Sequence, residues 1–209
     1  GNDPERILVI SFTRTAAGDI AAKVRGLGIA TAARVQANTL HSLCFRLLMR
    51  PALSHFVGRR PRILFPFEEW FLRQDLKIDG SRSMWDCELQ LKAFNAAWAR
   101  LQHENPGWPL DPNDQVFHQD LMEWLQFHNA MLLGELPTRV LDYLKNNPAA
   151  PEKYLYEHIL VDEYQDLNRA DQVVLDLLAE SASLTVIGDE DQSIYGGLRH
   201  AEPEGIRDF

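Results

Sequence analysis

Carboxylates follow two short apolar segments near the end of this 209-residue chain. The segment His158–Val161 runs directly into Asp162 and Glu163, and Asp189 follows the segment 184–187. A phosphate-bound Mg²⁺ takes one or two such carboxylates and keeps several waters. A neighbouring carboxylate can accept a proton from an attacking water. Asp162 and Glu163 fit this division of labour, although two acids after an apolar strand are equally common in helix caps and surface loops.

The segments around these carboxylates indicate a parallel sheet. A strand, a helix and a strand follow one another at 158–161, 173–178 and 184–187, a pattern that forms a right-handed parallel crossover. Parallel sheets bind ligands outside the carboxyl ends of their strands, where these acids lie. The amino-terminal part shows the same alternation: an apolar strand at 7–12 that we expect to be buried on both faces, a helix at 16–24, a strand at 35–39 and a helix at 40–48.

The middle of the chain is predicted to be helical. All five tryptophans lie here, and apolar residues recur at helical spacing over 87–101, 117–132 and 140–144. Aromatic residues at this spacing form a hydrophobic core more often than a base-stacking surface. The sequence therefore predicts an α/β domain with an inserted all-helical subdomain, with boundaries at 1–65, 66–150 and 151–209.

Composition excludes several classes of protein. Hydrophobic residues make up 45% and charged residues 24%, which are ordinary globular values. No apolar run reaches the roughly 18 residues of a membrane span, and no signal peptide is visible. Cys44 and Cys87 are too few for a disulfide framework or a cysteine-rich zinc site. We therefore expect a cytoplasmic protein without a membrane partner.

The charge is unevenly distributed along the chain. The net charge of −9 argues on average against nucleic acid as a partner. Residues 20–67, however, contain eight Lys and Arg and no Asp or Glu, whereas residues 68–209 carry −16. A basic run is often only a solvated surface, but a division this sharp indicates one anion-facing region on an acidic body.

Four short motifs resemble those of one helicase family. Residues 159–168 read ILVDEYQDLN and residues 186–195 read VIGDEDQSIY, which resemble the Walker B motif and the following coupling motif of UvrD/Rep-type superfamily-1 DNA helicases. Residues 10–17, ISFTRTAA, and 39–43, TLHSL, are similar to that family's TFTNKAA and TFHSL motifs. The motifs occur in the family's order and at its approximate spacing, so the resemblance covers nearly the whole chain.

The resemblance implies an incomplete RecA-like parallel-sheet core of the P-loop NTPase class with the inserted helical subdomain of the first motor domain. It implies an enzyme that uses ATP and Mg²⁺ to move on single-stranded DNA and to unwind junctions of single- and double-stranded DNA. The direction is expected to be 3′ to 5′, and the setting DNA repair or replication.

The resemblance also implies roles for individual residues. Asp162 is expected to ligate the Mg²⁺ of ATP, and Glu163 to orient or deprotonate the hydrolytic water. Gln192 is expected to sense the γ-phosphate, and Asp189 to lie at the nucleotide with Asp162 and Gln192. Without the resemblance, His41 is more simply a helix-start residue with a surface hydrogen bond. The residues expected to contact DNA are Phe12, Thr13, Arg14, Thr39, His41, Ser42, Tyr195 and Arg199.

Three features depart from the family pattern. Arg14 and Thr15 replace the usual Asn-Lys, and arginine can still hold a phosphate. Leu198 stands near the place of an aromatic residue, where base stacking is worth about 1–3 kcal/mol per base. The phosphate-binding loop G-x-x-x-x-G-K-[ST] occurs nowhere in the 209 residues.

The missing loop leads to an expectation about the parent protein. In the family this loop precedes the FTN-type motif, and a second motor domain with an arginine finger follows. We therefore expect a piece of a longer helicase, and we expect these residues alone not to hydrolyse ATP. A non-catalytic helicase-like module that binds DNA or a protein is the alternative, and a helicase fused to a nuclease is a third. Intact Asp162, Glu163 and Gln192 favour the enzyme.

Overall fold

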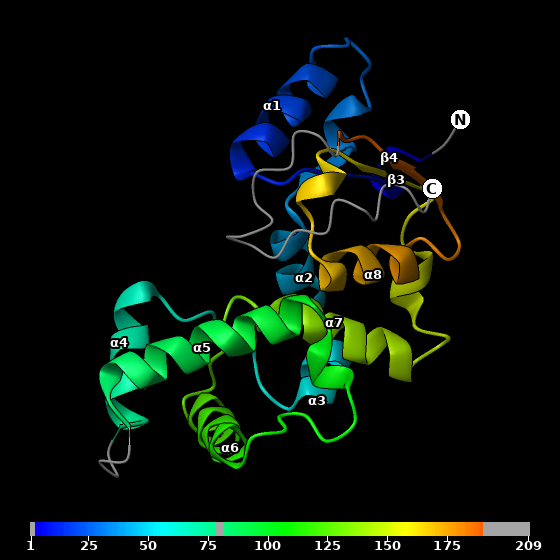
Figure 1. Ribbon diagram of the computed structural model, residues 1–209. Helices are drawn as coiled ribbons and strands as arrows, with labels where there is room; N and C mark the ends of the chain where they lie inside the picture. Colours follow the sequence, from blue (N-terminus) through cyan, green and yellow to red (C-terminus); the bar gives the residue numbers. More distant parts are fainter. Residues whose placement is uncertain (1–2, 78–81, 190–209) are drawn as a thin grey trace.

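The computed structural model describes residues 3–77 and 82–189 (Figure 1). Four strands form one parallel sheet in the order β2-β1-β3-β4. The strands are β1 (Ile7–Ile10), β2 (Gln36–Asn38), β3 (His158–Val161) and β4 (Ser183–Val186). The α-helices are α1 (Arg14–Arg25), α2 (Leu40–Leu48), α3 (Pro51–Val57), α4 (Pro66–Asp75), α5 (Met84–Ala99), α6 (Pro112–Phe127), α7 (Glu135–Asn146) and α8 (Arg169–Leu178). Short 3₁₀ helices lie at Pro4–Arg6, Ala32–Arg34, Gln102–Glu104, Pro151–Tyr154 and Tyr164–Asp166.

The sheet lies between two layers of helices. Helix α1 connects β1 to β2, and α8 connects β3 to β4 in the opposite direction along the sheet. Right-handed crossovers therefore place these two helices on opposite faces. Helix α2 lies on the face of α8, and α7 packs against both of them (Figure 1). This arrangement confirms the predicted RecA-like α/β class. Within the described residues, no helix is both long and apolar enough to cross a bilayer.

The central strands are buried on one face only. Leu8 and Ile10 of β1 and Ile159 and Val161 of β3 are fully buried, whereas the residues between them are half-buried. The expectation that the first strand is buried on both faces was therefore wrong. The half-buried face is the one that α1 covers, and α1 is rich in alanine and contributes only Ala17 to the buried residues. Small side chains cover less apolar surface than the leucines of α2 and α8 do.

The buried residues form two hydrophobic clusters. The first joins the sheet to α2, α7 and α8, and the second lies among α4, α5 and α6. Phe94, Trp98 and Phe117 belong to the second cluster, as the aromatic spacing predicts. Trp124 is only partly buried, and its indole N–H donates to Asp75 at 2.7 Å. The buried hydrophobic residues of α7 belong to the first cluster, so this helix packs with the α/β part of the chain. The division of the chain into three parts at residues 65 and 150 stays a prediction.

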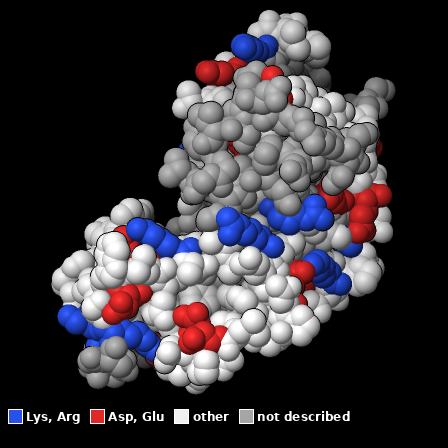
Figure 2. All heavy atoms as spheres, viewed as in Figure 1, with Lys and Arg blue, Asp and Glu red and all other residues white. Residues whose placement is uncertain are grey.

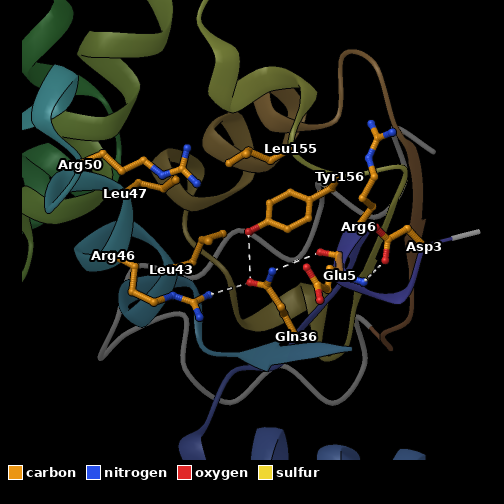
Figure 3. Close-up of a pocket in the computed structure, with 10 residues that line it drawn as sticks. All are labelled: Asp3, Glu5, Arg6, Gln36, Leu43, Arg46, Leu47, Arg50, Leu155 and Tyr156. Carbon is orange, nitrogen blue, oxygen red and sulfur yellow. Dashed lines mark hydrogen bonds between the residues drawn. The ribbon is translucent and has the colours of Figure 1, made fainter. Parts of the chain in front are cut away.

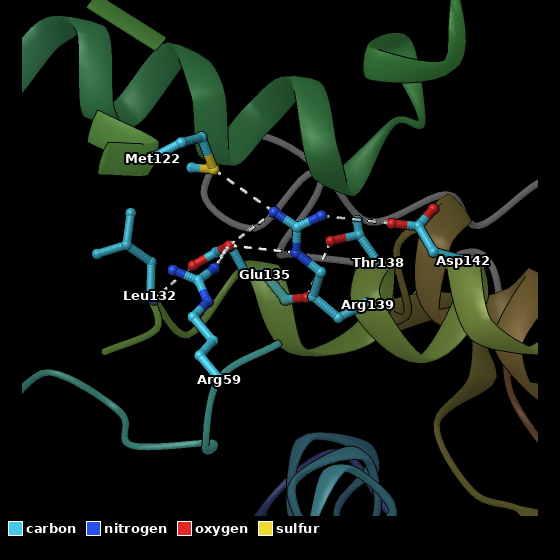
Figure 4. A network of polar contacts seen from close by, with 7 residues as sticks. All are labelled: Arg59, Met122, Leu132, Glu135, Thr138, Arg139 and Asp142. Atoms are coloured by element: carbon cyan, nitrogen blue, oxygen red, sulfur yellow. Dashed lines mark hydrogen bonds and ion pairs between the residues drawn. The ribbon is translucent and has the colours of Figure 1, made fainter. Parts of the chain in front are cut away.

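A buried ion-pair network stands where the two clusters meet (Figure 4). Glu135, the first residue of α7, is fully buried and pairs with the buried Arg59, which follows α3. Glu135 also accepts hydrogen bonds from Arg139, at 3.1 Å, and from the backbone N–H of Leu132, at 3.0 Å. Burial lowers the pKa of Arg59, and the charge of Glu135 opposes this effect. Met131 belongs to the first cluster and Leu132 to the second. Because Glu135 binds the backbone of Leu132, the network holds the chain at the point where the two clusters meet.

We expect Glu135→Gln to lower the free energy of unfolding by about 3–5 kcal/mol, because it leaves the Arg59 charge buried without its partner. Urea denaturation of the chain measures this loss. The matched control is Glu104→Gln, which breaks the partly exposed pair of Glu104 with Lys145 at 2.6 Å. Such exposed pairs are worth about 0–1 kcal/mol. Equal losses in the two variants would contradict the structural role of the network.

Candidate functional site

The carboxyl ends of all four strands lie along one edge of the sheet. Ile10 of β1 is in register with Asn38 of β2 and with Val161 of β3, which in turn is in register with Val186 of β4. The backbone hydrogen bonds continue one residue further, since the N–H of Asp162 donates to the Ile10 carbonyl at 2.8 Å. Every described residue with a predicted functional role follows one of these strand ends. The parallel register therefore brings the described parts of the four motifs to one edge.

Asp162 and Glu163 occupy different environments at the end of β3. Asp162 is half-buried, and its backbone is held by the hydrogen bonds of the sheet. The attachment point of its side chain is therefore fixed. Glu163 is exposed, and its φ of 56° lies in the left-handed region. A side-chain-bearing residue held in such a sparsely populated region costs about 1–3 kcal/mol and is concentrated at functional sites. The backbone thus leaves the direction of β3 at Glu163, directly after Asp162.

Gln165 connects the ends of β3 and β4, a role that sequence reasoning missed. Its side chain is buried, its amide nitrogen donates to Oε2 of Glu163 at 2.6 Å, and its amide oxygen accepts from the N–H of Asp189 at 3.1 Å. The N–H of Tyr164 also donates to the carbonyl of Ile187 at 3.1 Å. Gln165 lies inside the DEYQD string, so the sequence shows a polar residue beside Glu163. Its hydrogen-bond partner Asp189, however, is 24 residues away in sequence.

Three of the predicted site residues lie outside the described residues. Gln192 was expected at the nucleotide, and Tyr195 and Arg199 were expected to contact DNA. Asp189, the remaining predicted residue of that segment, is exposed and stands three residues after the end of β4. The predicted roles of all four residues stay predictions.

Two threonines predicted to contact DNA cap helices at this edge. The hydroxyl oxygen of Thr13 accepts from the N–H of Ala16 at 3.1 Å and caps α1. The hydroxyl oxygen of Thr39 accepts from the N–H of Ser42 at 3.3 Å and caps α2, while its O–H donates to the Ser42 hydroxyl at 2.9 Å. Helix N-termini attract anions through free N–H groups and the helix dipole. The edge that holds the carboxylates therefore also presents two helix N-termini.

The other predicted DNA-binding residues lie beside these caps. Arg14 is exposed at the first position of α1, and Phe12 packs partly against the first hydrophobic cluster. His41 is half-buried in the first turn of α2. The charge of His41 interacts with that of Asp171, a buried residue in the first turn of α8. The position of His41 in the first turn of α2 fits a helix-start residue, and its contact with DNA stays a prediction.

The basic segment 20–67 is only partly available to a ligand. On the face that Figure 2 shows, Lys and Arg side chains from the described residues as a whole form a broken band across the middle, with Asp and Glu side chains beside it. Half of the eight basic residues of the segment form ion pairs within the described chain. These pairs join Arg34 to Glu5, Arg50 to Glu152, Arg59 to Glu135 and Arg62 to Glu68.

A polar pocket of about 470 Å³ lies at the opposite end of the sheet (Figure 3). It opens beside Arg6 and Gln36, which stand at the amino ends of β1 and β2, and beside Arg46 of α2. The Arg46 guanidinium donates to Gln36 at 3.4 Å, and Arg6 pairs with Glu157 at 2.6 Å. Burial raises the pKa of Tyr156, which also lines this pocket. The pocket is separate from the edge that carries the predicted chemistry.

A second group of potential metal ligands lies in the helical part of the chain. His103, Glu104 and Asp142 offer ligand atoms within 4.8 Å of one another. Lys145 already holds Glu104 at 2.6 Å, and Arg139 lies 3.5 Å from Asp142. Internal cations thus already neutralise both carboxylates of this group.

The buried Asp171 generates a prediction on stability. Burial raises the pKa of its carboxyl group, while His41 and a backbone hydrogen bond at Asn168 act in the opposite direction. The folded state therefore binds this proton more tightly than the unfolded chain, so ionised Asp171 costs stability above the unfolded pKa of about 3.9. We expect Asp171→Asn to raise the thermal midpoint at pH 7.5, and the gain to shrink as the pH falls toward 4.

Thermal unfolding of Asp171→Asn at several pH values measures this gain, and a change of 1 kcal/mol corresponds to about 2–4 °C in a chain of this size. Asp19→Asn, at an exposed position of α1, is the control and is expected to have little effect at any pH. A gain that is the same at pH 7.5 and pH 4.5 would exclude the linkage to Asp171.

Comparison with known proteins agrees with the motifs. The family model of the UvrD/REP helicase N-terminal domain matches residues 1–209. The chain is 30% identical over 223 residues to the ATP-dependent DNA helicase PcrA of Staphylococcus epidermidis RP62A, and 29% identical over 220 residues to that of Staphylococcus aureus NCTC 8325. Each alignment covers 99% of this chain and 30% of the relative, so the chain spans about 30% of the length of these relatives. A match over every residue of the chain shows that it belongs to the UvrD/REP helicase family.

Proposed function

We propose that this chain is the amino-terminal motor part of a DNA helicase that couples ATP hydrolysis to movement on single-stranded DNA and to duplex unwinding. The observation that carries the proposal is the shared edge of the sheet. There the strand-end carboxylates Asp162 and Glu163 lie on the same side of the fold as the capped N-termini of α1 and α2. Because both sites lie on one edge of the sheet, a change in backbone position at the nucleotide site can shift the residues of the DNA site, and the reverse.

The nucleotide part of the proposal rests on Asp162 and Glu163. Asp162 fits Mg²⁺, because a half-buried carboxylate at a strand end is preoriented, and this ion takes one or two carboxylates and keeps several waters. Magnesium-bound ATP supplies the phosphoryl group that is transferred to water. Glu163, exposed toward solvent, would orient that water and accept its proton. Asp189 and Gln192, on the segment after β4, would lie near the nucleotide.

The DNA part of the proposal rests on α1 and α2. Their N-terminal N–H groups, the hydroxyls of Thr13, Thr39 and Ser42, and the side chains of Arg14 and His41 suit phosphate and sugar contacts, which position DNA without reading its sequence. Phe12 would lie along the same strand, with Tyr195 and Arg199 contributed by the segment after β4. The acidic remainder of the chain would limit nonspecific retention of DNA.

The remaining features of the proposal come from the family resemblance. They are 3′ to 5′ movement, action at junctions of single- and double-stranded DNA, a role in DNA repair or replication, and a cytoplasmic location. The phosphate-binding loop and the second motor domain would be supplied by other parts of the full-length protein. The relatives named above carry the description of ATP-dependent DNA helicases, which supports this assignment.

The catalytic proposal is tested by ATPase assays with single-stranded DNA. We expect the full-length protein to hydrolyse ATP, and Glu163→Gln to lower kcat by about 10²–10⁴-fold, because general-base catalysis contributes about this much. We expect the 209 residues alone to be inactive. Full activity of Glu163→Gln, or hydrolysis by the isolated 209 residues that Glu163→Gln abolishes, would contradict the proposal.

The DNA proposal is tested by fluorescence anisotropy of a labelled oligothymidine at several salt concentrations. We expect Arg14→Ala and His41→Ala to weaken binding, and Arg14→Ala to reduce the salt slope by about 0.7 for the one phosphate contact that it loses. Arg25→Ala, at the other end of α1, and His55→Ala, on α3, are the matched controls. Equal affinities in all four variants would exclude this edge as the DNA site.

A further inference from the structure

Gln165 is placed to control the position of Glu163. Gln165 is 1% exposed, and its amide makes contacts on both sides of the turn after β3. The nitrogen Nε2 donates to Oε2 of Glu163 at 2.6 Å, and the oxygen Oε1 accepts from the N–H of Asp189 at 3.1 Å. A primary amide has its donor and its acceptor on one rigid plane. The two contacts therefore fix the orientation of Gln165 and, through it, of the Glu163 carboxylate.

Glu163 requires such a contact because its own surroundings do not restrain it. Its side chain is exposed, and an exposed glutamate samples several rotamers, whereas a general base must hold one orientation toward its water. Its left-handed backbone directs the side chain away from the course that a continued strand would give it. The buried amide of Gln165 supplies a short hydrogen bond to one carboxylate oxygen and leaves Oε1 for other contacts.

The second contact extends this control to β4. The N–H of Asp189 belongs to the backbone of the family motif at residues 186–195, three residues after the end of β4, so a shift of the backbone at Asp189 would act directly on Oε1 of Gln165. The backbones of the two strand ends are also joined, because the N–H of Tyr164 donates to the carbonyl of Ile187 at 3.1 Å. Within the described residues, Gln165 thus provides a side-chain connection between the Glu163 carboxylate and the backbone after β4.

We propose that Gln165 is a positioning residue that holds Glu163 in its hydrolytic orientation and transmits displacements of the Asp189 segment to it. The inference rests on the proposed role of Glu163 in ATP hydrolysis. Two variants separate the contacts. Gln165→Glu has nearly the same shape and keeps an acceptor for the Asp189 N–H, but in its ionised form it places a second carboxylate against Glu163 where the amide donor stood. Gln165→Met has a similar length and loses both contacts.

The test is the DNA-stimulated ATPase of the full-length protein. We expect both variants to lower kcat by about 10- to 100-fold, as misplacement of a catalytic group does, with KM for ATP within about threefold. In a Glu163→Gln background we expect neither variant to lower kcat further, because the group that Gln165 positions is already disabled. Gln119→Glu is the matched control, since Gln119 donates to Glu123 at 2.9 Å on the exposed side of α6.

Amide hydrogen exchange of the 209-residue chain provides a readout that is independent of catalysis. We expect faster exchange of the Asp189 N–H in Gln165→Met and near-normal exchange in Gln165→Glu, which retains the acceptor. Unchanged kcat in both variants, a loss confined to KM, or a further loss in the Glu163→Gln background would overturn the inference while Glu163→Gln alone still inactivates the enzyme. Full activity of Glu163→Gln would instead refute the proposed function, and the inference with it.

Discussion

The parallel hydrogen-bond ladder between β1, β2 and β3 is the constraint on which the rest of the structure depends. Ile10 is aligned with Asn38 on one side and with Val161 on the other, although Val161 is 151 residues further along the chain. Parallel strands cannot be joined by tight turns, so each connection crosses over as a helix. A helix that follows a strand begins at the strand's carboxyl end, so α1, α2 and α8 all begin on the side of Asp162 and Glu163.

Much of this framework could be predicted from the sequence because it depends on local patterns. The strand at 158–161 matches β3, and the helices predicted around residues 44, 91 and 121 correspond to α2, α5 and α6. The largest errors in the predicted bounds lie at the ends of helices. Leu101 and Leu132 continue the apolar spacing but stand outside their helices, and Leu101 has a φ of 57° that ends regular helix. Spacing identifies a buried face and does not show where the backbone leaves it.

The polar interactions were much less predictable, because their partners are distant in sequence. Arg59 and Glu135 are 76 residues apart, and Arg50 and Glu152 are 102 residues apart. A count of charges over residues 20–67 therefore indicated more free positive charge than the fold leaves available. For Gln165 the composition of the motif was visible, but its contact with Asp189 arises only when β3 and β4 pair. Tertiary pairing, which no local pattern reports, decides which polar groups remain free for a ligand.

The proposed nucleotide residues and the proposed DNA residues are connected through the backbone of the strand ends. Asp162 is bonded through its N–H to the carbonyl of Ile10, and Ile10 leads within four residues to Arg14 at the start of α1. The N–H of Ser11 in turn donates to the carbonyl of Asn38, which precedes the Thr39 cap of α2. The strand ends that lead to the carboxylates and to the two helix N-termini are therefore joined by direct backbone hydrogen bonds. Because buried backbone hydrogen bonds are costly to leave unmade, a displacement of one strand end moves both the proposed nucleotide residues and the proposed DNA residues.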